Sequence, residues 1–176
     1  MRLTAACHEL RKVELTELGL NHLTRLEDLS PLAKLIGLHT LRLTWCRAVS
    51  DITPLGRLVA LEVLELVMMD VADIAPLANC AALTALQLTG FAVEQVRALA
   101  ALPRLKSLTL ADCNQLTDVS PLARCPSLEA LNLTSCMGLR GDLTALGNEC
   151  TSLRSLNVRS TQLTCSPREG LDVIFA

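Results

Sequence analysis

A short pattern of leucines, Leu-x-x-Leu-x-Leu, recurs along the chain at a nearly constant interval. It is complete in five places, which begin at Leu38, Leu61, Leu83, Leu105 and Leu128, and it has two variants, Leu10-Val13-Leu15 and Leu153-Leu156-Val158. Successive starts lie 22 to 28 residues apart. In each copy the last two apolar residues flank one polar residue, which is the alternation of a strand with one buried face. The pattern predicts about seven short strands.

Each strand is followed by a turn and by a segment with the signals of a helix start. Asp28-Leu29-Ser30-Pro31-Leu32 is one example, and 51–55, 73–77 and 118–122 keep the same order with Thr, Ala or Ser before Pro. A hydroxyl can accept a hydrogen bond from a free backbone amide, and Pro has no N–H to leave unpaired. The repeat 83–104 lacks this Pro and is predicted to be α-helical. The longer repeat from Leu128 contains Gly138 and Gly141, so its helical side is expected to be the least regular.

A strand on one side and a helical turn on the other, repeated at a fixed period, predict a solenoid in the α/β class. We expect a curved right-handed superhelix with a parallel concave sheet, in a single domain of residues 1–176. The repeats start near residues 10, 38, 61, 83, 105, 128 and 153. The apolar tail 171–176 either covers the last repeat or begins another one, so a fragment of a longer array stays open.

Composition changes this interpretation only in detail. Hydrophobic residues make up 51% of the chain but aromatic residues only 2%, so the core must consist of stacked aliphatic side chains. The net charge of −2 comes from well-mixed charges without a basic stripe, which argues against nucleic-acid binding. No apolar run approaches the roughly 18 residues that a membrane span needs. The N-terminus lacks the profile of a signal peptide, and we expect a cytoplasmic, monomeric protein.

Seven of the eight cysteines fall into two columns of the repeat. Three residues after the strand motif lie Cys46, Cys113 and Cys136, and three residues before it lie Cys7, Cys80, Cys125 and Cys150. Other repeats have mostly apolar residues at these positions, so these cysteines are predicted to be buried core residues. Cys113 and Cys136 should be neighbours that are able to oxidise. Cys165 lies outside both columns and is the candidate for an exposed thiol.

Neither catalytic nor metal-binding motifs are evident. The chain has no Cys-x-x-Cys pair, and His8, His22 and His39 share no ligand spacing with the cysteines. It also lacks a nucleophile elbow and a phosphate-binding glycine loop. The Asp of the Asp-x-Ser/Thr-Pro segments recurs with the repeat and is therefore predicted to be a turn or cap residue. We expect no enzyme activity, no metal and no cofactor.

The outward positions of the strands predict a partner-binding face. The central column is Glu14, Arg42, Glu65, Gln87, Thr109, Asn132 and Asn157, and a second column is Glu17, Trp45, Met68, Gly90, Asp112, Ser135 and Ser160. Trp45, the single Trp, should lie beside Met68 with Val67 and Val63 close by, framed by Arg42 and Glu65. An apolar group on a polar face is typical of an interaction hot spot. Alternatively, Trp45 folds over the edge of its repeat and has a structural role.

The repeats from Leu10 to Val158 resemble those of leucine-rich-repeat proteins. The run Asp51-Ile52-Thr53-Pro54-Leu55 is similar to repeats of bacterial internalins and phosphatase regulators, whereas Cys113 followed by Leu116-Thr117-Asp118 resembles the cysteine-containing class of F-box substrate receptors. The mixture resembles leucine-rich-repeat proteins of kinetoplastid protozoa. This resemblance implies a binding scaffold without catalysis.

Three functions follow from this interpretation. The first is a non-catalytic scaffold that binds a protein partner on the concave face. The second is an adaptor or substrate-receptor arm of a ubiquitin-ligase or phosphatase complex. The third is an extracellular adhesion or recognition ectodomain, which would need secretion and paired cysteines.

Overall fold

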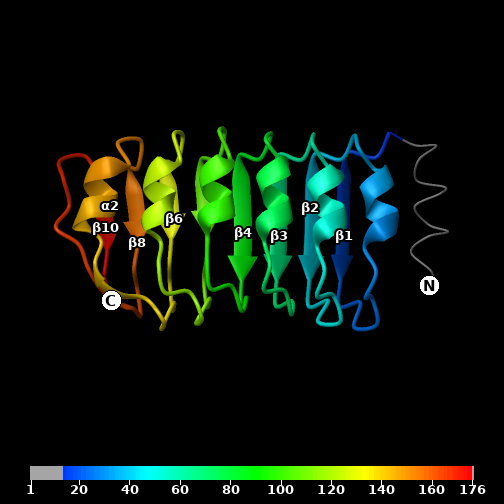
Figure 1. Cartoon of the computed structure of the whole chain (residues 1–176), viewed down its shortest axis with the longest axis horizontal. Coiled ribbons are helices and arrows are strands. Elements are labelled where there is room, and N and C mark those ends of the chain that lie inside the picture. Colours follow the sequence, from blue (N-terminus) through cyan, green and yellow to red (C-terminus); the bar gives the residue numbers. More distant parts are fainter. Residues whose placement is uncertain (1–13, 176) are drawn as a thin grey trace.

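The computed structural model describes residues 14–175, and these form a solenoid around one long parallel sheet (Figure 1). Consecutive strands lie side by side and all run in the same direction. In spatial order they are β1 (Glu17–Asn21), β2 (Thr40–Thr44), β3 (Val63–Val67), β4 (Ala85–Thr89), β5 (Ser107–Thr109), β6 (Ala130–Asn132), β8 (Ser155–Asn157) and β10 (Asp172–Ile174). A separate two-stranded sheet, β7 (Arg140–Asp142) with β9 (Gln162–Thr164), lies near the C-terminal end. The predicted leucine-rich-repeat solenoid is confirmed.

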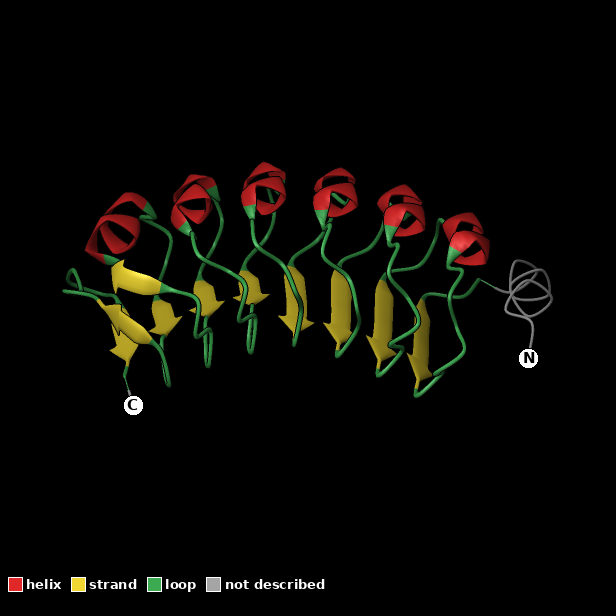
Figure 2. Cartoon of the chain, turned by 60° about the horizontal axis from the view of Figure 1, so that its bottom comes forward, coloured by secondary structure: helices red, strands yellow, loops and turns green. Residues whose placement is uncertain are grey.

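Short helices line the outer side of the arch and the long sheet lines the inner side (Figure 2). Five are 3₁₀-helices: η1 (Ser30–Lys34), η2 (Thr53–Arg57), η3 (Ala75–Asn79), η4 (Arg97–Ala101) and η5 (Ser120–Arg124). The sixth is the α-helix α2 (Thr144–Glu149). Because each helix is wider than the spacing of about 4.8 Å between strands, the stack curves toward the sheet. The sheet is therefore the concave face.

Two predictions about the helices were wrong, and the spacing of buried residues explains both. In the repeat 83–104 every third residue is buried, from Val93 through Val96 and Leu99 to Leu102. A spacing of three matches the three residues per turn of a 3₁₀-helix, and η4 is one. After Leu128 the buried residues are Leu139, Leu143, Leu146, Cys150 and Leu153, at alternating spacings of four and three. That spacing fits an α-helix, and this helical side holds α2.

The first repeat begins later than the sequence predicted. In the register of the sheet Gly19 lies opposite Arg42, so the strand motif is Leu15-Leu18-Leu20 and Leu15 itself precedes β1. This register keeps the 23-residue interval to Leu38, whereas the predicted start at Leu10 required 28. Gly19 therefore replaces Glu14 in the central concave column. Leu10 and Val13 lie outside the described residues.

The core is a stack of aliphatic layers, as the composition predicted. Leu41, Leu64, Leu86, Leu108, Leu131 and Leu156 lie opposite one another in the sheet, and each is at most 2% exposed. In the described range no buried polar or charged side chain is present. The tail forms β10 beside β8, and Leu171 is buried. The sheet thus has eight strands where about seven were predicted.

Six of the in-register cysteines fill this core as expected. Cys46, Cys80, Cys113, Cys125, Cys136 and Cys150 are buried with free thiols, and Cys7 lies outside the described residues. Burial raises the pKa of the Cys80 thiol to about 11. The pKa of Cys136 is also raised, by its hydrogen bond with Cys113 and by burial. Cys165 is half-buried, the most exposed of the seven described thiols.

The recurring aspartates serve as turn residues. The Oδ1 atoms of Asp28, Asp51, Asp73, Asp118 and Asp142 each accept a hydrogen bond from the backbone N–H two residues later, at 2.7–2.9 Å. The predicted hydroxyl cap was wrong, because the carboxylate takes that role and no Ser or Thr hydroxyl caps the helices that follow. The pKa values of Asp28, Asp51 and Asp142 are held below the usual value, first by the hydroxyl and then by the backbone N–H of the residue two positions later, which is Ser30, Thr53 or Thr144.

Candidate functional site

The turn after each strand begins with a residue in the left-handed backbone conformation. These residues form one column along the edge of the sheet where the strands end: His22, Trp45, Met68, Gly90, Asp112, Ser135 and Ser160, with φ between +54° and +71°. We call this row the left-handed column. It is the predicted second concave column, except that His22 replaces Glu17. Side chains here point away from the core, so the column forms one rim of the concave face.

Among residues 14–175, the concave face carries a charged cluster in its N-terminal half. Arg42 Nε lies 3.0 Å from a Glu65 oxygen, and Arg42 Nη1 lies 4.0 Å from Glu17. From β4 to β8 the neighbouring outward residues are uncharged and mostly small, as in Ala85-x-Gln87-x-Thr89 and Ser107-x-Thr109. Because the cluster is partly exposed, its ion pairs contribute little to stability. They hold Arg42 in a fixed position on an otherwise smooth surface.

The side chain of Trp45 is held on the rim by two neighbours, His22 and Arg47. Its indole stacks on the imidazole of His22, with ring centroids 6.2 Å apart and an interplanar angle of 7°. The Arg47 guanidinium carbon lies 5.0 Å from the centroid of the Trp45 ring. The side chain is still 40% exposed. Trp45 therefore packs against its neighbours and also presents an apolar surface, and its role in partner binding stays a prediction.

A hollow of about 340 Å³ lies next to Arg47. Its lining residues are Arg47, Met68, Met69, Asp70 and Gly90. Gly90 has no side chain, and the Met68 sulfur lies where its Cβ would be. Arg47 belongs to both features, because it lies over Trp45 and also lines the hollow.

The structure brings together only part of the predicted site. The Trp45 amide donates a 2.9 Å hydrogen bond to the carbonyl of Val67, so Val67 and Met68 adjoin Trp45. Val63 lies opposite Thr40 at the start of β3, four residues and roughly 13 Å from Val67, so it was wrongly placed near Trp45. Arg42 and Glu65 face each other across the middle of β2 and β3. Residues missed from the sequence are His22, which the corrected first register would have found, and Arg47 and Asp70, which had no signal.

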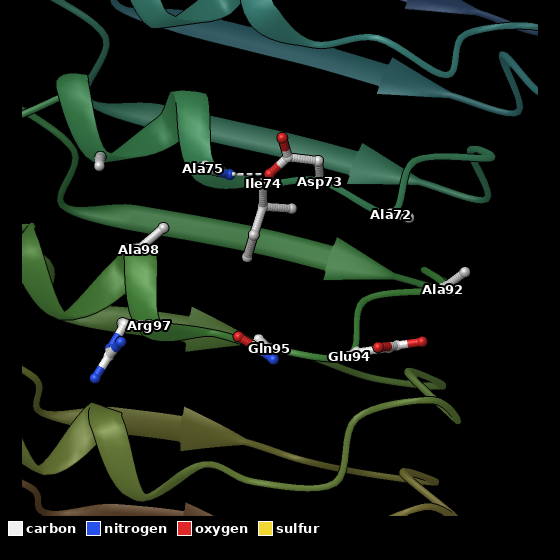
Figure 3. Close-up of a pocket in the computed structure, with 10 residues that line it drawn as sticks. Ala72, Asp73, Ile74, Ala75, Ala92, Glu94, Gln95, Arg97 and Ala98 are labelled. Carbon is white, nitrogen blue, oxygen red and sulfur yellow. Dashed lines mark hydrogen bonds between the residues drawn. The ribbon is translucent and has the colours of Figure 1, made fainter.

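A larger groove of about 700 Å³ lies on the helix side, between η3 and η4 (Figure 3). Small residues line it, namely Ala72, Ala75, Ala78, Ala92 and Ala98, and Ala98 stands where four other repeats have Pro. The Asp73 carboxylate is engaged by the Ala75 amide (Figure 3). Glu94 and Arg97 form no ion pair with any residue in 14–175. The groove assembles no nucleophile and base, so it offers no catalytic chemistry.

Within 14–175 no group of three or more His, Cys, Asp or Glu side chains is placed to hold a metal ion. No described helix is long and apolar enough to cross a membrane.

Comparison with known proteins places the fold. No protein-family model and no curated protein sequence matches the chain. Among solved structures it is similar to the internalin InlF of Listeria monocytogenes, with 24% identity and a TM-score of 0.77 over 98% of this chain and 50% of that one. It is also similar to the leucine-rich-repeat domain of the type III effector XopL, with 19% identity and a TM-score of 0.76 over 96% of this chain and 70% of that one.

A third similar structure is the plant peptide hormone receptor RGFR1 in complex with RGF2, with 17% identity and a TM-score of 0.66 over 85% of this chain and 26% of that one. The chain spans about half the length of InlF. These likenesses show that the chain has the leucine-rich-repeat fold, in agreement with the resemblance seen in the sequence. The kinetoplastid type stays a prediction.

Proposed function

We propose that the chain is a non-catalytic interaction module that binds a protein partner across the concave face and the rim at Trp45. One observation carries the proposal: the indole of Trp45 is exposed beside Met68, and contacts with His22 and Arg47 hold it in place. Few other aromatic side chains are present among the described residues. Hot spots of protein interfaces are enriched in Trp and Arg, and here Arg47 lies over the Trp ring. Because the stack with His22 and the contact with Arg47 already order the indole, Trp45 would lose little side-chain entropy when a partner binds.

The fold supports the same proposal. A solenoid with a smooth concave sheet presents an extended surface to a partner. Among the similar structures, RGFR1 is a receptor in complex with the peptide RGF2, which is a property of that protein. We further propose a cytoplasmic setting, supported by six cysteines that fill core positions as free thiols.

Quantitative affinity purification tests this function. The tagged chain is compared with the variant Trp45→Ala/Met68→Ala in extracts of cells that express it. The matched control is Ile36→Ala/Val59→Ala, which removes two exposed apolar side chains, 65% and 59% exposed, from the loops before β2 and β3. We expect a small set of proteins to be lost with the first variant and retained with the control. Equal retention by both variants, or equal loss from both, would refute the proposal.

A further inference from the structure

We propose that the C-terminal half of the concave face recognises an acidic side chain of the partner protein through three residues, Asn132, Asn157 and Arg159. We call these three residues the donor patch. This inference rests on the proposed function and adds the chemistry of the partner. It is built from the local hydrogen bonds of the two asparagines, the position of Arg159, and the difference in charge between the two ends of the concave face.

Both asparagines present the donor end of their side chain. Asn132 Oδ1 accepts hydrogen bonds from the Thr134 amide at 3.0 Å and from the Thr134 hydroxyl at 2.6 Å, and Asn157 Oδ1 accepts one from the Arg159 amide at 3.1 Å. A backbone N–H can only donate, so the side-chain atom that it reaches must be the oxygen. Neither Nδ2 donates a hydrogen bond to any residue of 14–175. The Nδ2–H donors of both residues are therefore available to an acceptor on a partner.

The sheet places these donors side by side. Asn132 and Asn157 lie opposite each other in β6 and β8, at a strand spacing of about 4.8 Å, and both are half-buried. Arg159 follows Asn157 by two residues, and Val158 between them is buried, so the exposed Arg159 lies on the concave side. The Arg159 carbonyl accepts a 2.9 Å hydrogen bond from the Ser135 amide, which continues the strand pairing. The backbone of two adjacent repeats thus holds the donor patch in place.

Arg159 supplies the positive charge of the donor patch. Among residues 14–175 its guanidinium forms no ion pair, whereas Arg42, toward the other end of the concave face, lies within 4.0 Å of both Glu17 and Glu65. A guanidinium presents planar donors that match the geometry of a carboxylate. The cluster around Arg42 has two carboxylates for one cation, so it repels an acidic group. The charges on the concave face therefore direct a partner's carboxylate to the donor patch.

Two acidic residues of this chain limit where that carboxylate can lie. Asp112 is on the rim, in the left-handed column, and Asp172 begins β10 opposite Ser155. Because like charges repel, the partner's carboxylate should lie away from both, over Asn157 and Arg159. The partner that fits this surface is a protein segment with one Asp or Glu between uncharged residues.

The first experiment selects such a segment. A phage-displayed library of random 12-residue peptides is panned on the immobilised full chain, and enriched peptides are expected to contain Asp or Glu. One of them is synthesised with a fluorophore, and its Kd is measured by anisotropy. Replacing its acidic residue by Asn or Gln should raise the Kd by roughly tenfold to a hundredfold, the usual range for a charge-assisted hydrogen bond. Absence of enrichment, enrichment without acidic residues, or a Kd that the replacement leaves unchanged would overturn the inference.

The second experiment exchanges donors for an acceptor at nearly constant shape. Asn157→Asp keeps the oxygen that accepts the Arg159 amide but replaces the Nδ2 donors by a second carboxylate oxygen, and Asn132→Asp makes the same exchange in β6. Each variant should raise the Kd of the acidic peptide by roughly tenfold or more. The matched control is Asn114→Asp, because Asn114 Oδ1 also accepts a backbone hydrogen bond, from Met137, but lies in the turn after β5. An equal Kd for all three variants would remove the asparagines from the interface and overturn the inference.

The third experiment reverses the charge. Arg159→Glu should weaken the acidic peptide, and a peptide with Lys in place of its acidic residue should bind this variant more tightly than it binds the wild type. Arg124→Glu makes the same change in η5, on the outer side, and should leave both Kd values unchanged. Thermal unfolding checks that all variants are folded. If the wild type and Arg159→Glu bind each peptide equally, Arg159 does not read the charge and the inference fails.

A competition experiment distinguishes a protein segment from a general polyanion. A single-stranded oligonucleotide at the same concentration should not displace the acidic peptide, and displacement would assign the donor patch to a polyanion and refute a protein partner there. If cellular partners still depend on Trp45 and Met68 while the peptide tests fail, the proposed function stands and only the chemistry of the donor patch is wrong.

Discussion

Leu108→Ala tests whether the stacked leucines hold the solenoid together. Leu108 lies in β5 with its side chain 1% exposed, and Leu86 and Leu131 are its partners in the neighbouring strands. Truncation leaves a cavity that the two flanking layers can fill only in part. Changes of this kind in a tightly packed core cost about 2–5 kcal/mol, a large share of the roughly 5–15 kcal/mol that stabilise a typical domain.

The next residue along the strand is the matched control. Thr109 lies on the concave face, half-buried and opposite Gln87 and Asn132. Thr109→Ala should therefore change the free energy of unfolding by less than about 0.5 kcal/mol. Urea unfolding followed by circular dichroism compares the two variants. With an m-value of about 2 kcal/mol/M, Leu108→Ala should lower the midpoint by roughly 1–2.5 M.

Hydrogen exchange then tests how far the damage spreads. Each repeat contacts its neighbours in sequence, so amides of β4, β5 and β6 should lose protection while those of β1 and β2 keep theirs. Similar midpoints for Leu108→Ala and Thr109→Ala would refute the alternation of faces on which the whole description depends. Uniform loss of protection along the chain would refute nearest-neighbour coupling.

Four further outcomes are expected. Trp45→Ala should cost only about 1–2 kcal/mol in thermal unfolding, because its ring stack and cation contact are partly exposed; a loss as large as that of Leu108→Ala would assign Trp45 to the core. Because burial raises the pKa of Cys80 and Cys125 to about 11 from 9.0, stability should decline between pH 9 and 11 by up to roughly 3 kcal/mol per thiol, and Cys80→Ala/Cys125→Ala should flatten this decline in urea titrations. The lowered pKa of Asp51 gives stability that is present above pH 3.8 and lost as pH falls through the folded-state pKa, so Asp51→Asn should melt slightly below wild type at pH 7 with a shallower loss in acid, and an unchanged acid profile would count against the cap. Gly138→Ala should lose about 1–3 kcal/mol in urea unfolding because its Cβ would lie 2.5 Å from the carbonyl oxygen of Asn114, whereas Gly37→Ala, with open space around it, should be neutral.

The repeating leucines made most of the fold predictable, because each one specifies both a strand face and a layer of the core. Leu64-Glu65-Leu66 is a clear case: its two leucines are fully buried, and Glu65 faces the concave side beside Arg42. The same register predicts that Cys80 and Cys125 lie in the core, and both are buried. Position within the repeat was the stronger signal, because chemistry alone would have suggested a metal or a disulfide.

The predictions of the first strand and of the helix types were wrong where local sequence signals disagreed with the repeat interval. Leu15 belongs to two overlapping motifs, and only Leu15-Leu18-Leu20 keeps the interval to Leu38, so the variant that starts at Leu10 gave a shifted first strand. The type of helix followed from the spacing of buried residues such as Val96 and Leu99, and not from helix propensity. Tertiary spacing therefore overrode local preference, as is usual for short elements.

The rim was predictable in its backbone but not in its contacts. The period placed Trp45 and Met68 in one column, and β2 and β3 confirm that neighbourhood. It gave no information on the stack with His22, on Arg47, or on the hollow that brings Arg47 and Gly90 together from turns two repeats apart. Those contacts depend on the side-chain conformations of irregular turns, which a repeating pattern does not determine.

The left-handed column separates what the fold needs from what it merely permits. Positive φ is easiest for Gly, and Asp is among the residues that tolerate it, so Gly90 and Asp112 suit the turn. Bulky residues there carry strain on the order of 1 kcal/mol or more each, yet Trp45 and Met68 occupy adjacent positions of the column. The core does not require a bulky residue here, since Trp45 is 40% exposed and two other repeats have a serine at the equivalent position, Ser135 and Ser160. Strained and clustered residues, at a position that the fold would fill more easily with Gly or Asp, support the proposed interaction surface at this rim.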